Sequence, residues 1–415
     1  MSNEEKLTAL NNTISLCRKS EFYGPRLPVE PLKWLEDIKK LPLTTKEDIR
    51  QNSPFGLVSV PPRELYQYHE TFGTTGTPAA TWLTKEDLYD LAHRVNESGI
   101  GFTEEDTVLV RFPYAISTVA HFTHLAAQLK NACVIPASSR TTISPFCKIV
   151  DLMKKLEVTV LASLPLQAVL IAETAELLGL RPDKDFPKLR AINTAGELLT
   201  PRRRKVIEDI WGVPVYDNYG MTEIGPTIVD CSYQVPHPLD DRFLFEILDD
   251  DMRNEVRPGD IGNLVVTTLS RKGTPLIRYI TGDRARVVKS SCKCGKDTAF
   301  ELRGRKKDVI QVGERVFDMR DLEDMLEQIP GVRFWVVGPM KEGIRFVIEY
   351  ENQIGRATVK AIEEAFNVKV SIDIVPRGTL CDRHELLSIG EAGKPRYIYS
   401  QQELEAKAYL GTAKI

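Results

Sequence analysis

The stretch HETFGTTGTPAATWLT, which begins at His69, has the composition of a loop that binds an anion. Glycine lets backbone N–H groups approach a ligand closely, and threonine adds a hydroxyl donor without adding charge. The stretch therefore predicts a phosphate-binding loop, with an ordinary polar turn as the alternative. It is not a Walker loop, because no Gly-Lys-Ser/Thr follows. The residues expected to contact phosphate are Thr71, Gly73, Thr74, Thr75, Gly76 and Thr77.

Three later segments place polar residues at the end of an apolar run: NTAGE (193–197), DNYGMTE (217–223) and RYITGD (278–283). In open α/β sheets, ligands bind where the carboxyl ends of strands meet loops. The three segments are therefore expected to line a ligand site. Each one taken alone is equally explained by a turn or a helix cap.

ATP with Mg²⁺ is a ligand that would use the side chains of these segments. Tyr219 would stack on the adenine ring, and the backbone of Gly196 would lie flat against it. Thr222 would hydrogen-bond a phosphate, and Asp283 would accept both ribose hydroxyls. Glu223 would bind Mg²⁺, because this ion prefers hard oxygen ligands.

The first two-thirds of the chain alternates helical patterns with short apolar runs, which predicts an α/β fold. The expected strands include DTVLVRF, ACVIPA, VTVLASL, LRAINTAG and VPVYDNYG. Amphipathic helices are expected at SPFCKIVDLMKKLE and PLQAVLIAETAELLG, where apolar residues recur at helical spacing.

The pattern changes from about Phe243, where RFLFEILD, GNLVVTTL and RARVVK predict a β-rich subdomain. The basic segment LRGRKKDVIQVGERV then precedes strands and a helix that predict a small α+β domain. We expect an N-terminal domain at residues 1–303, its β-rich subdomain at about 228–300, and a C-terminal domain at residues 304–415.

The composition narrows the class of protein. A chain of 415 residues suggests two or three domains, and contents of 42% hydrophobic and 27% charged residues are those of a soluble globular protein. The net charge of −3, without a strongly basic block, makes nucleic acid an unexpected partner. The start, MSNEEKLTALNN, lacks signal-peptide features, and no run reaches the length of a membrane span. A cytoplasmic protein without membrane contact is expected.

The odd number of seven cysteines argues against a disulfide framework. Cys292 and Cys294 in CKCG, with Cys231 and His237 in DCSYQVPH, offer four ligands for a closed tetrahedral zinc site. The alternative is that these are free thiols near a surface turn. The expected role of the zinc is structural, in the β-rich subdomain. The cysteines expected to serve only in packing are Cys17, Cys133, Cys147 and Cys381.

Taken together and in order, TFGTTGTP, AGE, YGMTE, RYITGD, GRKKD and a late GK resemble the adenylate-forming acyl- and aryl-CoA synthetase superfamily. The chain is most similar to the phenylacetate-CoA ligase family, through YGMTEIGPTIVDC, HPLDDRFLFEILDD, GNLVVTTLSRKGTPLIRYITGD and the CKCG ahead of RGRKKDVIQVGERVF. The resemblance extends from about Tyr23 to Tyr397. It implies an AMP-forming ligase that adenylates an aromatic or related carboxylic acid with ATP and Mg²⁺ and transfers the acyl group to coenzyme A. It also implies that the small C-terminal domain is mobile, and it supports the Cys and His zinc site.

The same resemblance assigns roles within the nucleotide site. The loop at 71–78 would hold the β- and γ-phosphates of ATP while a carboxylate attacks the α-phosphorus. Phe72 stands where relatives usually have a small hydroxyl residue, and Thr77 stands where many have lysine, so both remove donors. The other implied contacts are Gly196 and Glu197 flanking the adenine, Tyr219 stacked on it, Thr222 on the α-phosphate, Asp283 and Arg305 on the ribose, and Ala195, Asn218, Gly220 and Met221 beside them.

Two lysines of the C-terminal region match functional positions of the superfamily. Lys394, in SIGEAGKPRYIY, aligns with the lysine that is brought over the active site for adenylation. Its ammonium would offset the repulsion between the attacking carboxylate and the α-phosphate. Lys307 falls at the hinge about which the small domain would rotate between the two half-reactions.

The acid pocket is expected in RFPYAISTVAHFTHLAAQL, which corresponds to a Gly-rich stretch and a pocket helix in the family. This chain lacks the glycines, keeps a family histidine at His124 and adds His121, and Gln167 stands where relatives tend to have tyrosine. His121 and Gln167 would recognise a polar substituent, unless the histidines are simply satisfied on a helix face. The expected pocket residues are Tyr114, Ser117, His121, His124 and Gln167, with Phe112, Ile116 and Phe122 suited to an aromatic ring.

Two other functions stay open at this point. The activated acid could be passed to a carrier-protein thiol, an amine or another nucleophile instead of coenzyme A. The chain could also be a catalytically inactive nucleotide-binding homologue, for which Phe72 and Thr77 are the best support. The sequence leaves open whether the chain forms a homodimer.

Overall fold

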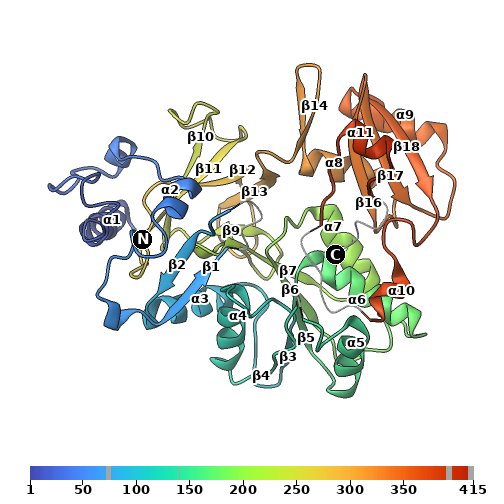
Figure 1. Cartoon of the computed structure of the whole chain (residues 1–415), viewed down its shortest axis with the longest axis horizontal. Coiled ribbons are helices and arrows are strands. Elements are labelled where there is room, and N and C mark those ends of the chain that lie inside the picture. The colour runs from blue at the N-terminus through green and yellow to red at the C-terminus, as the bar shows by residue number, and fades with distance from the viewer. Residues whose placement is uncertain (72–75, 140, 389–394, 410–415) are drawn as a thin grey trace. The chain divides into compact units, whose positions relative to one another are not determined.

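The computed structural model describes residues 1–71, 76–139, 141–388 and 395–409, and the chain divides into two compact units. The first unit consists of Met1–Asp106, Phe112–Pro136 and Tyr216–Glu301. The second consists of Thr107–Arg111, Ala137–Val215 and Leu302–Ile415. Figure 1 shows the elements of both units.

Among the described residues, the first unit has four α-helices, and polar side chains cap the start of three of them. Thr45 and Asp48 form a capping box at the start of one helix, and Thr84 and Asp87 form the same arrangement at the start of another. Each box satisfies backbone N–H groups that the first turn of a helix leaves free. These helices are α1 (Asn3–Cys17), α2 (Lys46–Gln51), α3 (Lys85–Asn96) and α4 (Val119–Gln128), with the short 3₁₀ helices η1 (Leu35–Lys40) and η2 (Pro62–Glu64).

The strands of the first unit are mostly antiparallel. β1 (Gln67–Glu70) pairs with β2 (Ala80–Leu83), and β8 (Gly225–Asp230) pairs with both β7 (Val215–Met221) and β9 (Pro236–Pro238). The predicted β-rich subdomain is confirmed as a sheet with the order β10-β11-β12-β13. Its strands are β10 (Phe243–Leu248), β11 (Gly262–Thr268), β12 (Tyr279–Lys289) and β13 (Thr298–Arg305), and the unit also contains β4 (Cys133–Ile135).

The second unit contains parallel strands β3 (Thr107–Val110), β5 (Val160–Ser163) and β6 (Ala191–Ala195) and helices α5 (Phe146–Lys155), α6 (Pro165–Leu177) and α7 (Pro201–Trp211). This is the predicted α/β alternation. The expectation that PLQAVLIAETAELLG is amphipathic is wrong, because every residue of α6 from Pro165 to Ala175 is buried. Over these residues the helix is buried on all sides, so it packs in the interior of its unit.

The rest of the second unit is the predicted α+β region. β16 (Trp335–Met340), β17 (Gly343–Glu349) and β18 (Lys369–Val375) form one sheet, and α9 (Arg356–Phe366) lies beside it in Figure 1. Ile310, Leu322, Trp335, Phe346 and Ile362 belong to its buried core. The remaining elements are β14 (Val309–Val312), β15 (Arg315–Asp318), α8 (Met319–Met325), η3 (Leu326–Gln328), α10 (Arg383–Leu386) and α11 (Gln401–Glu405).

Glu173 of α6 is the centre of a buried ion cluster. It is 1% exposed, and its carboxylate oxygens lie 2.7 Å from an Arg333 nitrogen, 2.7 Å from Arg377 and 2.6 Å from Arg383. Burial alone raises the pKa of the Glu173 carboxyl, but the three guanidinium groups hold it below its ordinary value. The cluster therefore ties α6 to the region after residue 302 by charge. A cavity of about 310 Å³ is lined by this cluster.

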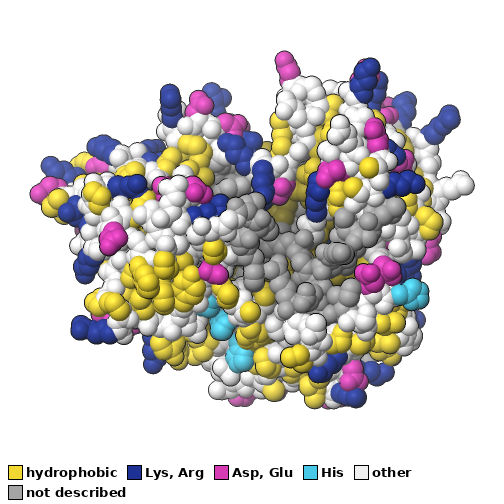
Figure 2. Space-filling view, viewed as in Figure 1, with side chains coloured by type: hydrophobic (Ala, Val, Ile, Leu, Met, Phe, Trp, Pro, Cys, Tyr) yellow, Lys and Arg dark blue, Asp and Glu magenta, His cyan; other side chains and the backbone are white. Residues whose placement is uncertain are grey.

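The predicted strands and helices named above are thus confirmed, whereas a domain boundary at residue 303 stays a prediction. On the face drawn in Figure 2, basic and acidic side chains are interspersed over the described residues. Among those residues, no helix has both the length and the apolar character needed to cross a membrane. Cys17 and Cys381 are buried as expected of packing residues, but the same expectation is wrong for Cys133, which is exposed.

Candidate active site

The predicted phosphate loop connects β1 to β2. Backbone and side chain close it at the base, because Thr71 N–H donates to the Ala79 carbonyl at 3.0 Å and Ala79 N–H donates to Thr71 Oγ1 at 3.1 Å. Gly76 has φ of +134° and, like Thr77, is exposed. Phe72, Gly73, Thr74 and Thr75 lie outside the described residues. Two hydrogen bonds thus close the base of this connection, and a Cβ added at Gly76 would meet no atom of the described residues within 4 Å.

Thr222 and Glu223 lie in the turn between β7 and β8. The expected strand VPVYDNYG reaches Gly220, and β7 continues one residue further to Met221 because β8 returns beside it, with Met221 opposite Gly225. Gly220 is required there, since a Cβ on it would lie 2.2 Å from the Gly225 carbonyl oxygen. The turn brings Glu223 back towards the body of the first unit.

The Glu223 carboxylate is buried and has two partners. Its side chain is 2% exposed, the Tyr279 hydroxyl donates to Oε1 at 3.1 Å, and Lys46 Nζ lies 3.0 Å from the same oxygen. The Glu223 main-chain carbonyl accepts from Arg271 Nη2 at 3.2 Å and from Thr81 Oγ1 at 3.4 Å. A buried carboxylate with hydroxyl and ammonium neighbours is a hard oxygen donor that fits Mg²⁺.

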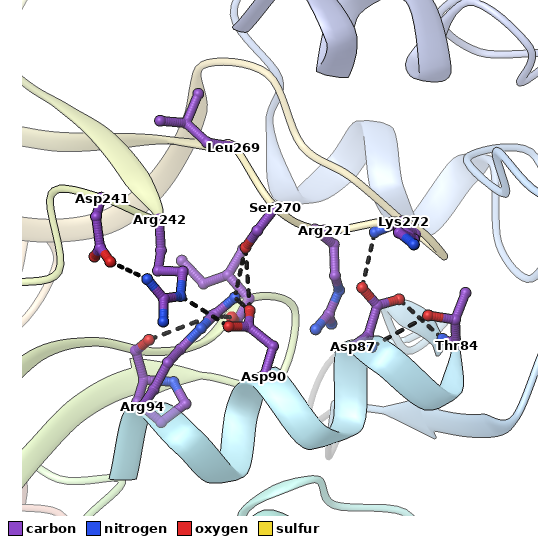
Figure 3. A network of polar contacts seen from close by, with 12 residues as sticks. Thr84, Asp87, Asp90, Arg94, Asp241, Arg242, Leu269, Ser270, Arg271 and Lys272 are labelled. Atoms are coloured by element: carbon purple, nitrogen blue, oxygen red, sulfur yellow. Dashed lines mark hydrogen bonds and ion pairs between the residues drawn. The ribbon is translucent and has the colours of Figure 1, made fainter. Parts of the chain in front are cut away.

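A polar network on α3 fixes the turn on the other side of Glu223 (Figure 3). Arg94 is 1% exposed and donates to the Ile224 carbonyl at 2.9 Å. Asp90 pairs with Arg94 and, at 2.8 Å, with Arg242. Burial alone raises the pKa of the Asp90 carboxyl, but the two guanidinium groups bring it below its ordinary value. The ionised cluster holds the backbone next to Glu223 in place.

The same figure shows how Arg271 is positioned. Asp87, on the first turn of α3, accepts from the backbone N–H groups of Lys272 and Gly273, both at 2.8 Å. Burial lowers the pKa of the Arg271 guanidinium to about 10, so it still carries its charge at neutral pH. Arg94 and Arg271 were not predicted as site residues, because their contacts join segments that are far apart in the sequence.

Tyr219 and Asp283 meet inside the first unit. The Tyr219 hydroxyl donates to Asp283 Oδ2 at 2.6 Å, and Asp283 is 7% exposed. The prediction that RYITGD ends a strand is wrong, because Asp283 lies within β12, which pairs with β11 and continues to Lys289. Tyr219 lies at a bulge of β7, next to the buried Asn218. The pair presents an aromatic ring and a carboxylate together, as adenosine binding would require.

In the second unit, Ala195, Gly196 and Glu197 come at the end of β6, as predicted. Gly196 has φ of +84°, and Glu197 Oε2 accepts from the Leu166 N–H at 3.2 Å at the start of α6. Gln167 follows at once in the chain. It is 1% exposed, and neither atom of its side-chain amide has a hydrogen-bond partner among the described residues.

The predicted site residues further along the chain are Arg305, Lys307 and Lys394, and the structure describes the first two. Arg305 is the last residue of β13 and is half-buried. Lys307 is exposed in the turn between β13 and β14. Lys394 lies outside the described residues.

Tyr114, His121 and His124 of the predicted acid pocket lie together in the first unit. His121 Nε2 donates to the Tyr114 carbonyl at 2.9 Å, and the Tyr114 hydroxyl is 3.0 Å from His124 Nδ1. The neighbouring residues in the sequence differ in exposure. Ser117, Phe112 and Phe122 are buried, whereas Ile116 is 48% exposed. Both histidines thus have partners, which agrees with the alternative of a satisfied helix face as well as with a pocket.

His69 joins this group and was missed from the sequence. Its Nδ1 donates to the Ile116 carbonyl at 3.1 Å, and its ring centroid is 5.2 Å from that of His121. Burial and then the neighbouring His121 lower the pKa of His69 to about 4, so it is neutral at physiological pH. The available signal was its place on a short strand just ahead of the threonine-rich loop.

Comparison with known proteins decides the family. The sequence model of the AMP-binding enzyme family matches residues 27–270. The chain is 32% identical over 314 residues to a phenylacetate-coenzyme A ligase from Pseudomonas putida, over 72% of this chain and 70% of that protein. The chain belongs to the AMP-binding enzyme family. A phenylacetate-coenzyme A ligase from Thermus thermophilus is 31% identical over 72% of this chain and 67% of its own length.

The fold of this AMP-binding enzyme also matches solved structures. A crystal structure of a 2-hydroxyisobutyryl-CoA ligase aligns with a TM-score of 0.84 and 20% identity, over 98% of this chain and 91% of that one. At that identity the likeness establishes the fold.

This AMP-binding enzyme brings the four predicted metal ligands together. The ligand atoms of Cys231, His237, Cys292 and Cys294 all lie within 4.8 Å of one another. Cys231 Sγ is 3.5 Å from Cys292 Sγ, and Cys294 Sγ is 3.2 Å from His237 Nε2. His237 Nδ1 donates to the Thr298 carbonyl at 2.6 Å, which leaves Nε2 for a metal. Three sulfurs and an imidazole nitrogen at this spacing fit a tetrahedral zinc ion.

Proposed function

We propose that this chain is an AMP-forming ligase that converts a carboxylic acid into its adenylate with ATP and passes the acyl group to coenzyme A. The observation that carries the proposal is the buried Glu223 carboxylate, which the Arg94 and Arg271 contacts hold by its backbone in an AMP-binding enzyme. No covalent protein intermediate is needed, so catalysis depends on positioning and on electrostatic stabilisation.

The roles of the first unit follow from its chemistry. Tyr219 stacks on the adenine and Asp283 accepts from the ribose, while Asn218, Gly220 and Met221 line the nucleotide. Thr222 donates to the α-phosphate, and the loop at Thr71 and 73–77 donates to the β- and γ-phosphates. Glu223 would hold Mg²⁺, an ion that when bound would supply positive charge for the phosphates.

The roles of the second unit rest on the family resemblance. Ala195, Gly196 and Glu197 bind adenine, and Arg305 binds ribose. Lys394 neutralises charge during adenylation, and Lys307 is the hinge for the second half-reaction.

ATP–pyrophosphate exchange, measured across a panel of aromatic and aliphatic acids, tests the function. Acid-dependent exchange, followed by AMP release that depends on coenzyme A, is the expected result. Nucleotide binding without exchange for any acid would make the chain an inactive homologue. Exchange with AMP release only on addition of a carrier-protein thiol or an amine would favour the alternative acceptor.

The acid is proposed to be aromatic with a hydroxyl or amino substituent. Gln167 is the support, because burying an amide without a partner costs about 1–3 kcal/mol and a polar group of the substrate would remove that cost. In the first unit, His69, whose pKa is lowered to about 4 by burial, lies beside the predicted pocket residue His121.

Gln167→Leu is therefore expected to lower the preference for hydroxy- or amino-substituted aryl acids over phenylacetate by about tenfold. The measurement is kcat/KM for phenylacetate, benzoate and their hydroxy and amino derivatives. Gln128→Leu, an exposed position on α4, is the matched control and should change nothing. Phenylacetate as the best substrate of the unmodified protein would contradict the argument.

Zinc is the proposed ion of the Cys231, His237, Cys292 and Cys294 cluster. We expect about one zinc per chain in protein purified without chelator, measured by elemental analysis. Cys292→Ser should lower both zinc content and Tm, because structural metal binding contributes to folding. Cys133→Ser, which changes an exposed cysteine away from the cluster, should alter neither. Protein that contains no zinc would rule out the proposal that these four residues form a zinc site.

A further inference from the structure

The phosphate loop lacks a positive charge of its own. Residues 71–78 contain no lysine or arginine, and Thr77 is exposed. Pyrophosphate is strongly anionic, so its departure needs cationic partners. Within the described part of the first unit, Lys46 is the residue whose ammonium contacts the Glu223 carboxylate, the proposed Mg²⁺ ligand.

The main chain at Lys46 is firmly held. The Thr44 N–H donates to the Arg278 carbonyl at 3.0 Å, and the Thr44 carbonyl accepts from the Ile280 N–H at 2.9 Å. Thr44 is therefore joined to the same strand region that supplies Tyr279, the other partner of Glu223. The capping box of Thr45 and Asp48 then starts α2, with Lys46 as its first residue.

The side chain of Lys46 is not held in the same way. It is 34% exposed, whereas its partner Glu223 is 2% exposed. A lysine carries its ammonium on a flexible four-carbon stem, so the charged end can move while the backbone stays in place. An ammonium 3.0 Å from Glu223 Oε1 would be repelled by a divalent cation bound to that carboxylate.

We infer that Lys46 is an exchangeable cation of the phosphate site: it neutralises Glu223 when no metal is bound, and its ammonium moves to the β- or γ-phosphate when Mg²⁺ occupies Glu223. This inference rests on the proposed function. In this arrangement the Lys46 ammonium supplies the positive charge that Thr77 lacks. The buried Glu223 carboxylate is neutralised at every stage, first by Lys46 and then by the metal.

Isothermal titration of magnesium pyrophosphate, MgATP and AMP into the full chain tests the inference. Lys46→Met keeps most of the side-chain stem and is expected to weaken magnesium pyrophosphate and MgATP binding about tenfold or more, because it removes a charge-assisted contact. AMP lacks the β- and γ-phosphates, so its affinity should stay within about twofold. Lys46→Arg should recover most of the affinity.

Lys85→Met is the matched control, because Lys85 is also the first residue of a helix that follows a Thr–Asp capping box in the same unit, but it is exposed and its ammonium lies over the Tyr89 ring. It should bind all three ligands as the unmodified protein does. A second readout needs no nucleotide: Mg²⁺ alone should raise the Tm of Lys46→Met more than that of the unmodified protein, since the competing ammonium is gone.

Unchanged pyrophosphate and MgATP affinities in Lys46→Met would overturn the inference and leave the proposed function standing. Equal loss of AMP and MgATP affinity would also overturn it, because a fixed structural counterion predicts that result. If the unmodified protein bound neither MgATP nor pyrophosphate, the proposed function itself would fail, and the role of Lys46 with it.

Discussion

Glu223→Gln is expected to reduce acid-dependent pyrophosphate exchange about 100-fold or more. Glutamine keeps the size of the side chain and can still accept a hydrogen bond from the Tyr279 hydroxyl, but it lacks the charge that is proposed to hold a divalent cation. The loss should appear in kcat, because a cation held by Glu223 would stabilise charge that develops in the transition state. A higher Mg²⁺ concentration should recover only part of the rate.

Tyr279→Phe is the matched control for Glu223→Gln. It removes one hydrogen bond to the carboxylate, worth roughly 1 kcal/mol, and leaves the charge in place. A reduction of a few-fold is expected, with Tm measured for both variants to detect misfolding. A Glu223→Gln variant that keeps more than about a tenth of the exchange rate would show that another group holds the metal.

Lys394→Ala is expected to lower the rate of adenylate formation about 100-fold or more, while the Kd for MgATP changes by no more than about twofold. The reason is that the ammonium is proposed to act only on the charge shared by the attacking carboxylate and the α-phosphate. This prediction rests on the GK motif and its alignment, since Lys394 is outside the described residues. Single-turnover adenylation and equilibrium ATP binding are the two measurements.

Lys341→Ala, at an exposed lysine of the C-terminal region, is the control for Lys394→Ala and should leave both quantities unchanged. The thioester half-reaction, started from isolated acyl-adenylate, should survive in Lys394→Ala. Retention of most of the exchange rate by Lys394→Ala would refute the proposed role.

The sequence predicted the strands and helices well where burial gives a simple pattern. VTVLASL and LRAINTAG are apolar runs bounded by turns, and they form β5 and β6. The same logic failed at Asp283, because an antiparallel partner extends β12 beyond the turn-like glycine. The helix α6 was predicted correctly, but its expected amphipathic character was wrong, because the helix is buried on all sides from Pro165 to Ala175.

For the candidate site, the sequence identified residues that belong to short motifs. The metal cluster is the clearest case, since two pairs of ligands in local spacing converge in the structure. Lys46, Arg94 and Arg271 could not be found in this way, because each reaches the Glu223 turn from a segment distant in the chain. His69 was missed for a similar reason, since its contacts with Ile116 and His121 join segments that are distant in the chain.

The Glu173 cluster has a consequence for how ionic strength should act on the two half-reactions. A rotation about Lys307 that carried residues beyond the hinge away from α6 would separate a 1% exposed carboxylate from Arg333, Arg377 and Arg383. Dissolved salt screens charges once water reaches them and so favours the separated state. Thioester formation should accordingly speed up with added salt while adenylation does not, and the ratio of the two rates would report how readily α6 releases its arginines.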